Sequence, residues 1–353
     1  MHPITEALLN WYDENARKMP WRGISDPYGI WVSEIMLQQT RVETVRDYYV
    51  RFMKRFPTLK DLAEAPEEDV LKMWEGLGYY SRARHLHRGV QQVMKEYGGI
   101  VPRDPVILRT LSGIGPYTSC SIASIAYGIA VPAVDGNVIR VICRLYGIAD
   151  NPMEKPGRLQ IEKLAGELVP GERAGDHNQA MMDLGATVCV PGTPDCDNCP
   201  LCRYCHAFQN GNAEELPKLP KSAPPREIIY DLPIIRSGDC ILLYRRTEKL
   251  LQGLWCFPLL EGNRTERQMT EAILRKFGIS VKQAILAGEA KHVFTHQIWK
   301  MNLFLVTAPE TVTAPEGYVW TPLEKMKELA LPSAMRIPRK MAEDWLSDGV
   351  SDQ

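Results

Sequence analysis

The chain has 353 residues, of which 45% are hydrophobic. A chain of this length seldom folds around a single hydrophobic core, so we expect two domains. Lys and Arg number 42 against 43 Asp and Glu, and the formal net charge of -1 excludes a chain that is basic overall, so any DNA-binding face must be local. No apolar run approaches the roughly 20 residues of a membrane helix, and no signal peptide opens the chain, so we expect a cytoplasmic protein without membrane contact.

The first part of the chain, residues 4–208, is predicted to be a succession of helices separated by short loops rich in Gly and Pro. Apolar side chains recur there at helical spacing in two places. The first set is Val32, Ile35, Met36, Val42, Val45, Tyr49 and Phe52, and the second is Val138, Val141, Ile142 and Leu145. We therefore predict an all-α domain over residues 1–208.

The apolar period stops at residues 208–226, where proline, charge and small polar side chains predominate. This composition is typical of an interdomain linker, which we place at 209–227. Beyond it, three runs have strand-like composition and one has helical composition. The strands are expected at 228–235, 240–244 and 300–307, and the helix at 266–277. The second domain, predicted at 228–346, is therefore α+β.

Five of the nine cysteines lie within residues 189–205, which is not the distribution of disulfides through a small secreted domain. Cys189, Cys196, Cys199 and Cys205 are separated by six, two and five residues, and four thiolates are what a 4Fe-4S cluster requires. Cys202 completes a second Cys-x-x-Cys pair with Cys199, so the spacing alone leaves a four-cysteine zinc site open.

A Gly-x-Gly hairpin at 111–115 precedes Pro116 and a helix expected from Tyr117. Free N–H groups at a helix start attract an anion, and the glycines Gly113 and Gly115 let a phosphate approach the main chain. An ordinary turn between helices is the alternative. A similar hairpin occurs at 74–80, also between two helical segments.

Two carboxylates stand in segments that suggest chemistry. Asp135 precedes an amphipathic helix and is expected to cap it, and N–H donors at a positive helix end should lower its pKa. Glu34, at helical spacing, shares a face with Leu37, Gln38 and Arg41, a mixture that suits neither a core nor a solvated surface. A solvent-exposed Glu34 is the alternative interpretation.

The segments 32–40, 111–115, 134–138 and 178–186, followed by the cysteine spacing, resemble the MutY family of adenine DNA glycosylases in the helix-hairpin-helix superfamily. The motifs occur in the family's order over nearly the whole chain. The resemblance implies a 4Fe-4S cluster on Cys189, Cys196, Cys199 and Cys205, with Cys202 as an extra thiol.

The activity implied by the resemblance is removal of adenine mispaired with 8-oxoguanine or guanine in double-stranded DNA, leaving an abasic site. Glu34 would be the general acid that protonates adenine N7, and Asp135 would stabilise or capture the sugar cation. Tyr117 and Asn137 would orient the base and the intermediate. Related endonuclease III enzymes use a lysine where Tyr117 stands, so we expect no efficient strand cleavage.

Because a duplex hides the glycosidic bond, the adenine must leave the base stack. The resemblance implies an adenine pocket, a wedge that fills the vacated space, and hairpin contacts to the backbone. Pocket and DNA-facing residues are Trp21, Arg22, Leu37 and Gln179, the wedge residues are Gln39 and Tyr79, and the hairpin glycines are Gly113 and Gly115. Some relatives carry Glu at the position of Gln179. We expect a monomer.

In the second domain, residues 254–258 and the following helix resemble the family's Nudix-like domain. The helix at 265–275 lacks the acidic cluster that would hold magnesium, which argues against hydrolysis of nucleotide diphosphates. Phe294, Thr295 and His296 match the loop that inspects 8-oxoguanine. The competing interpretations are a non-catalytic iron-sulfur protein that binds damage, a bifunctional glycosylase-lyase and a Nudix hydrolase.

Overall fold

The computed structural model describes residues 1–220 and 223–348. Contacts divide the chain into two compact units, Met1–Ala65 with Arg84–Lys221, and Pro66–Ala83 with Ser222–Gln353. The fold class expected from the sequence is confirmed, since helices form the first unit and a sheet with helices forms most of the second. The grouping of 66–83 with the C-terminal residues was not anticipated.

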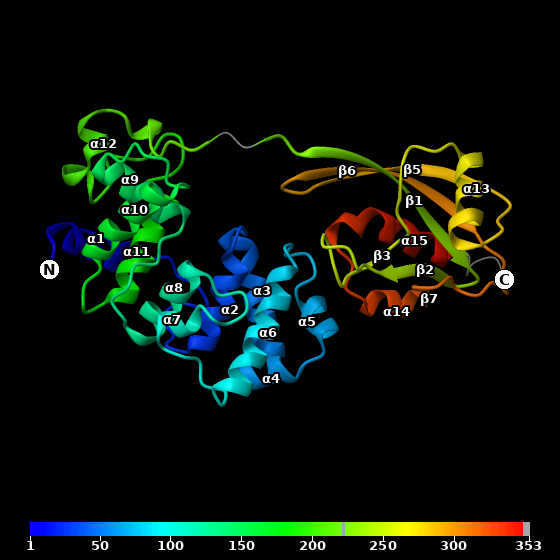
Figure 1. Ribbon diagram of the computed structural model, residues 1–353, viewed down its shortest axis with the longest axis horizontal. Coiled ribbons are helices and arrows are strands. Elements are labelled where there is room, and N and C mark those ends of the chain that lie inside the picture. Colours follow the sequence, from blue (N-terminus) through cyan, green and yellow to red (C-terminus); the bar gives the residue numbers. More distant parts are fainter. Residues whose placement is uncertain (221–222, 349–353) are drawn as a thin grey trace. The chain divides into compact units, whose positions relative to one another are not determined.

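The N-terminal part of the chain is helical, as predicted (Figure 1). Its helices are α1 (Pro3–Asn15), α2 (Pro27–Leu37), α3 (Val42–Arg55), α4 (Leu59–Glu64), α5 (Glu67–Met73), α6 (Ser81–Glu96), α7 (Pro105–Leu108), α8 (Pro116–Tyr127), α9 (Gly136–Tyr146), α10 (Lys155–Leu168), α11 (Ala174–Thr187) and α12 (His206–Gln209). The apolar face of α9 packs with α1, α10 and α11 in one core that includes Leu8, Ile142, Ile161 and Leu184.

The apolar period of residues 32–52 belongs to two helices rather than one. Asp26 begins α2, because its carboxylate accepts hydrogen bonds from the N–H groups of Tyr28 and Gly29. That helix ends at Leu37, and Arg41 is the N-cap of α3. The expectation that Arg41 shares a helical face with Glu34 is therefore wrong.

The second unit is built on a seven-stranded sheet in the described part of the chain, in the order β3-β2-β1-β6-β5, with β4 paired to β1 and β7 to β2. Long β1 and β6 run parallel, and β5 pairs antiparallel with β6. The strands are β1 (Arg226–Ser237), β2 (Cys240–Arg245), β3 (Trp255–Cys256), β4 (Leu260–Glu261), β5 (Ala284–Val293), β6 (Gln297–Thr307) and β7 (Tyr318–Pro322). The three predicted strands are confirmed as β1, β2 and β6.

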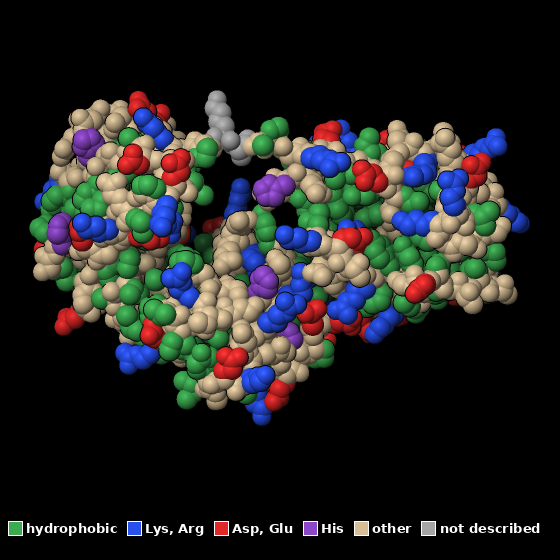
Figure 2. Space-filling view, viewed as in Figure 1, with side chains coloured by type: hydrophobic (Ala, Val, Ile, Leu, Met, Phe, Trp, Pro, Cys, Tyr) green, Lys and Arg blue, Asp and Glu red, His purple; other side chains and the backbone are tan. Residues whose placement is uncertain are grey.

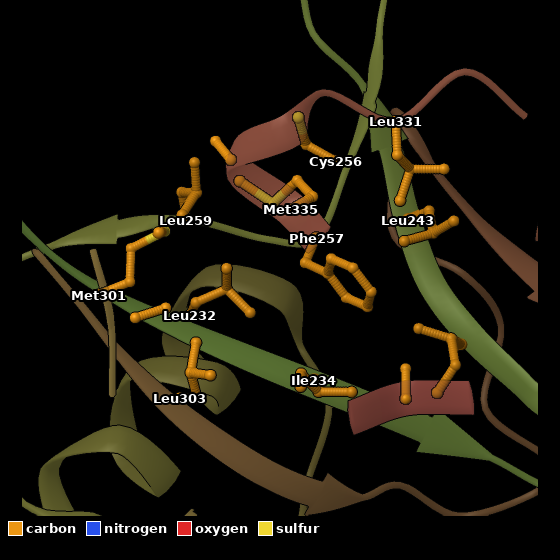
Figure 3. Close-up of a cluster of buried hydrophobic side chains, with 14 of the residues drawn as sticks. Leu232, Ile234, Leu243, Cys256, Phe257, Leu259, Met301, Leu303, Leu331 and Met335 are labelled. Atoms are coloured by element: carbon orange, nitrogen blue, oxygen red, sulfur yellow. The ribbon is translucent and has the colours of Figure 1, made fainter. Parts of the chain in front are cut away.

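Alternating side chains of these strands pack into two hydrophobic cores, one on each face of the sheet. Ile234, Leu243 and Leu303 contribute to one, which also contains Phe257 and Met335 (Figure 3). Their sequence neighbours Ile235, Leu242 and Phe304 contribute to the other, together with α13 (Glu266–Phe277). Such alternation is expected of a sheet that is covered on both faces. The predicted helix at 266–277 is confirmed, and α14 (Leu323–Glu328) and α15 (Arg336–Asp348) complete the unit.

Residues 66–83 are tied to the C-terminal residues by polar contacts around Glu75. Its Oε1 accepts hydrogen bonds from the N–H of Leu331 and from Arg339 Nη1, both at 3.1 Å. Lys72 Nζ donates to the carbonyl of Leu329 at 3.0 Å. The hairpin that follows α5 is therefore part of the second unit.

The predicted linker begins with ordered structure. A short 3-10 helix forms at Ala213–Glu215, and the buried Leu216 accepts a hydrogen bond from Arg144 Nε at 3.0 Å through its carbonyl. Residues 221 and 222 of the predicted linker lie outside the described residues. Among the described helices, none is both long and apolar enough to cross a membrane. Figure 2 shows charged side chains of both signs on each unit, in keeping with the near-neutral composition.

Candidate active site

One cleft of the first unit, about 730 Å³ in volume, collects the residues that the sequence assigned to chemistry. Its walls come from α2, α8, α11, the start of α9 and the segment between α1 and α2. The predicted residues on its lining are Trp21, Arg22, Glu34, Leu37, Gln39, Gly113, Gly115, Tyr117, Asp135, Asn137 and Gln179. Segments that are 158 residues apart in sequence, from Trp21 to Gln179, thus contribute to a single site.

Glu34 is carried by α2 and is only 6% exposed, so the alternative of a solvent-exposed glutamate is wrong. Its Oε2 atom is buried without a hydrogen-bond partner among the described residues. Burial is the largest influence and raises the pKa of Glu34 above its ordinary value. Hydrogen bonding by Tyr117 and Ser121 lowers it in part, and the charges of Asp135, which raises it, and Arg22, which lowers it, have smaller effects. A carboxyl group in such surroundings retains its proton to higher pH.

Asp135 is the N-cap of α9, as predicted. Its carboxylate accepts hydrogen bonds from the N–H of Val138 at 2.8 Å and from Asn137 Nδ2 at 2.9 Å. The expected lowering of its pKa is wrong in net direction. Burial raises the pKa of Asp135 by more than these hydrogen bonds and the charge of Arg140 lower it. The sequence reveals the cap, whereas the degree of burial depends on the tertiary packing around the cleft.

Tyr117 lies in the first turn of α8, and its hydroxyl donates a hydrogen bond to Met182 Sδ at 3.2 Å. Burial raises the pKa of the Tyr117 phenol well above its ordinary value, so the hydroxyl stays protonated. Ser121 follows four residues later, on the same face of α8, and hydrogen bonding by its buried hydroxyl favours the ionised form of Glu34. Neither Met182 nor Ser121 was expected at the site from the sequence.

Asn137 is held beside Asp135 by the close approach of α11 to α9. A Cβ atom on Gly185 would lie 2.6 Å from the Asn137 Cβ, so a side chain at that position would push the two helices apart. The Asn137 Oδ1 also accepts a hydrogen bond from Arg140 Nη2 at 2.9 Å. Gly185 is therefore a third residue that the sequence did not single out.

The hairpin at 111–115 has the geometry that its glycines suggested. Gly113 adopts φ +81°, in the left-handed region, and a Cβ there would lie 2.7 Å from the Cβ of His85. Gly115 is the N-cap of α8 and offers no side chain to cap it, and Pro116 fills the first helical position. The start of α8 thus has no side-chain cap on its main-chain N–H groups.

The two proposed wedge residues share an unusual backbone conformation. Gln39 has φ 56° and Tyr79 has φ 48°, both in the left-handed region that non-glycine residues seldom adopt. Gln39 lines the cleft of the first unit. Tyr79 belongs to the second unit, where its side chain is 45% exposed. Such strain is found at functional sites where the surrounding structure maintains it.

The loop of residues 294–296 joins β5 to β6 in the second unit. Phe294 anchors it, since its ring contacts those of His292 and Trp299 edge to face, with centroids 4.5 and 4.8 Å away. Thr295 and His296 are exposed. The hydroxyls of Thr295 and Tyr79 lie 2.8 Å apart, within hydrogen-bonding distance, so the structure brings together two residues that the sequence assigned to different tasks.

The cysteine loop surrounds a small cavity in the first unit, which is lined by Cys189, Cys196, Cys199, Cys202 and Cys205. None of the nine cysteines forms a disulfide. Arg144 Nη1 donates to Cys189 Sγ at 3.4 Å, and Cys205 Sγ donates to the Arg144 carbonyl at 3.4 Å. A buried cation beside four thiols fits a site for thiolates that carry several negative charges.

Comparison with known proteins agrees with this geometry. Residues 32–170 match the HhH-GPD superfamily of base excision DNA repair proteins, and residues 232–337 match the NUDIX domain. The adenine DNA glycosylase of Mus musculus is 36% identical over 96% of this chain and 77% of its own length. The chain belongs to the adenine DNA glycosylase family.

Other members of the family extend the match. The adenine DNA glycosylase of Homo sapiens is 35% identical over 94% of this chain and 72% of its own length. The adenine DNA glycosylase of Buchnera aphidicola from Acyrthosiphon pisum is 32% identical over 93% of this chain and 94% of its own length. Among solved structures, a thermostable thymine-DNA glycosylase is 30% identical with a TM-score of 0.55, over 58% of this chain and 95% of its own. Endonuclease III trapped on DNA has the same helical fold, with a TM-score of 0.51 and 23% identity over 59% of this chain and 95% of its own.

Proposed function

We propose that this chain hydrolyses the N-glycosidic bond of adenine mispaired with 8-oxoguanine or guanine in double-stranded DNA and leaves an abasic site. The observation that carries the proposal is that one cleft of about 730 Å³ is lined by a buried carboxyl group, Glu34, and a partly buried one, Asp135. That cleft is large enough for an extruded nucleotide. Family membership supports adenine as the base that is removed, and the two carboxyl groups in the cleft support hydrolysis by acid catalysis with stabilisation of the sugar cation.

Glu34 acts as the general acid. Adenine is a poor leaving group as an anion, and protonation at N7 lets it depart neutral. The raised pKa of Glu34 keeps a proton available near neutral pH, because burial penalises the carboxylate. The side chain lines the cleft, so its proton is accessible to a base that enters there.

Asp135 stabilises the sugar as it gains positive charge. The N–H of Val138 and the amide of Asn137 hold its carboxylate in place, and they favour the ionised form against the effect of burial. A developing cation in the cleft favours that ionised form further, since opposite charges attract strongly in a poorly solvated site. Asn137 and Tyr117 fix the position of the carboxylate and of the sugar.

The reaction ends at the abasic site because a phenol stands at position 117. A lyase needs an amine to form a Schiff base, and Tyr117 supplies a protonated hydroxyl instead. The test uses duplexes that carry adenine opposite 8-oxoguanine, with product measured before and after alkali. We expect strand breaks only after alkali. Efficient cleavage without alkali, together with a stoichiometric borohydride adduct, would contradict the proposal.

Cys189, Cys196, Cys199 and Cys205 would hold a 4Fe-4S cluster, which would brace the loop behind α9. These four cysteines line one small cavity together with Cys202 and Arg144. Family membership supports the cluster over zinc. Cys196→Ala should lose iron, whereas Cys202→Ala should retain it, as measured by metal analysis. One zinc and no iron in anaerobically prepared protein would contradict the assignment.

The second unit would recognise 8-oxoguanine, with Phe294 as the anchor and with Thr295 and His296 as the exposed groups. Nudix hydrolysis is not expected of it, because the two glutamates of α13 are engaged elsewhere. Glu266 Oε1 accepts the N–H of Leu286 at 2.8 Å, and Glu271 pairs with Arg267 at 3.3 Å. The domain limits of 1–208 and 228–346, the monomeric state and a cytoplasmic location are part of this proposal.

A further inference from the structure

Asp183 of α11 is a buried carboxylate that holds two arginines at the wall of the cleft. Its side chain is 0% exposed. Arg17 Nε and Arg22 Nη2 each donate to Oδ1 at 2.8 Å, and the two guanidinium groups make one further contact each, Arg17 Nη2 to Oδ1 and Arg22 Nη1 to Oδ2. The N–H of Arg17 also lies 3.4 Å from Oδ2. One carboxylate thus binds two cations.

Both arginines come from the segment between α1 and α2, which also carries Trp21. Arg17, Trp21 and Arg22 all line the cleft. Asp183 is therefore the attachment by which α11 fixes this wall. Removing the carboxylate while keeping the arginines would leave two poorly solvated cations with no compensating charge.

Those cations matter because Glu34 lies on the same cleft. The groups that act on the Glu34 carboxyl are Tyr117 and Ser121 from α8, Asp135 ahead of α9, and Arg22. Arg22 is the cation among them. Its effect is smaller than those of the other three groups, and it favours the ionised form of an acid that must be protonated to react. The buried carboxylate of Asp183, paired with Arg22, opposes that effect by neutralising the guanidinium.

We propose that Asp183 is a positioning residue for the glycosylase reaction: it fixes Arg22 on the cleft wall and neutralises the Arg17–Arg22 pair, so that Glu34 keeps its catalytic proton. This inference rests on the proposed function of Glu34. Asp183 acts through Arg22 and does not touch the base. A purely structural attachment would predict loss of stability without any change in the pH dependence of the reaction.

The decisive variant is Asp183→Asn, which preserves the shape of the side chain and removes its charge. Single-turnover excision of adenine opposite 8-oxoguanine is measured with the full chain from about pH 5 to 9. Unpaired cations lower the pKa of Glu34, so the midpoint of the alkaline limb should move to lower pH by at least about half a unit. At acidic pH the rate should stay within about threefold of the unsubstituted chain. An equal loss of rate at every pH would overturn the inference.

Two further variants keep the inference testable if Asp183→Asn folds poorly. Arg17→Gln leaves Asp183 with one cation, so the midpoint should move to higher pH, and no shift would contradict the electrostatic role. Asp13→Asn is the matched control, because Asp13 pairs with Arg173 on the surface and is 51% exposed; its profile should match the unsubstituted chain. If the unsubstituted chain excises no adenine, the proposed function fails; if it does and Asp183→Asn has the same midpoint, only this inference fails.

Discussion

The cleft of the helical unit and the loop 294–296 of the sheet unit differ in the solvent exposure of their functional polar side chains. In the cleft, Glu34 is buried and Asp135 is partly buried, and loss of solvent raises the pKa of both. In the loop, Thr295 and His296 are exposed, and Phe294 alone is anchored by packing. Proton transfer requires a perturbed group in a dry site, whereas inspection of a base edge requires a group that can reach it. Substitutions should therefore have unequal effects in the two regions.

The largest effect is expected for Glu34→Gln. The amide cannot donate the required proton, so excision should fall by about 1,000-fold or more, within the range attributed to general acid catalysis. Duplex binding should persist, since the amide has the same shape. Single-turnover kinetics and a binding titration measure the two effects. Glu43→Gln on the exposed face of α3 is the control, and near-normal excision by Glu34→Gln would refute the assignment.

Asp135→Asn should cost somewhat less, about 100- to 1,000-fold in rate. Asparagine caps a helix about as well as aspartate, so α9 should keep its start while the negative charge is lost. Thermal unfolding measured with the kinetics separates the two roles. A large drop in melting temperature with an unchanged rate would show that Asp135 is only a cap.

Substitutions in the loop 294–296 should affect recognition of 8-oxoguanine rather than the chemical step. Replacing Thr295 and His296 together by alanine should slow capture of adenine opposite 8-oxoguanine by about ten- to a hundredfold, the worth of one recognition pair. Removal of adenine opposite guanine should change little, and this second substrate is the internal control. Equal losses on both substrates would indicate a general defect in DNA binding or folding.

The smallest effect is expected for Ser121→Ala. The hydroxyl lowers the pKa of Glu34, so its removal should raise that pKa and move the alkaline limb of the rate to higher pH, with a change in rate of a few fold. Ser119→Ala is the matched control, because the Ser119 hydroxyl donates to the Pro116 carbonyl of its own helix at 2.9 Å. A shift of the alkaline limb to lower pH in Ser121→Ala would contradict this role of the hydroxyl.

By itself the sequence determined the elements and the chemical groups. The features used for prediction are local: apolar residues at helical spacing, glycines at the turns between helices, and runs of strand-like composition. They made the α and α+β regions and the cap at Asp135 predictable. Motif order also indicated Glu34 and the cysteines. Strands such as β5 and β7 escaped prediction, because their burial alternates irregularly and depends on what the sheet packs against.

Tertiary structure decided the environment of each group. The pKa of Asp135 rises because burial in the folded chain outweighs its local hydrogen bonds, which act in the opposite direction. Asp183 meets Arg17 across 166 residues, and Tyr79 meets Thr295 across 216. Burial and charge pairing depend on residues that are distant in sequence, so no local pattern encodes them, and they determine which carboxylate keeps its proton.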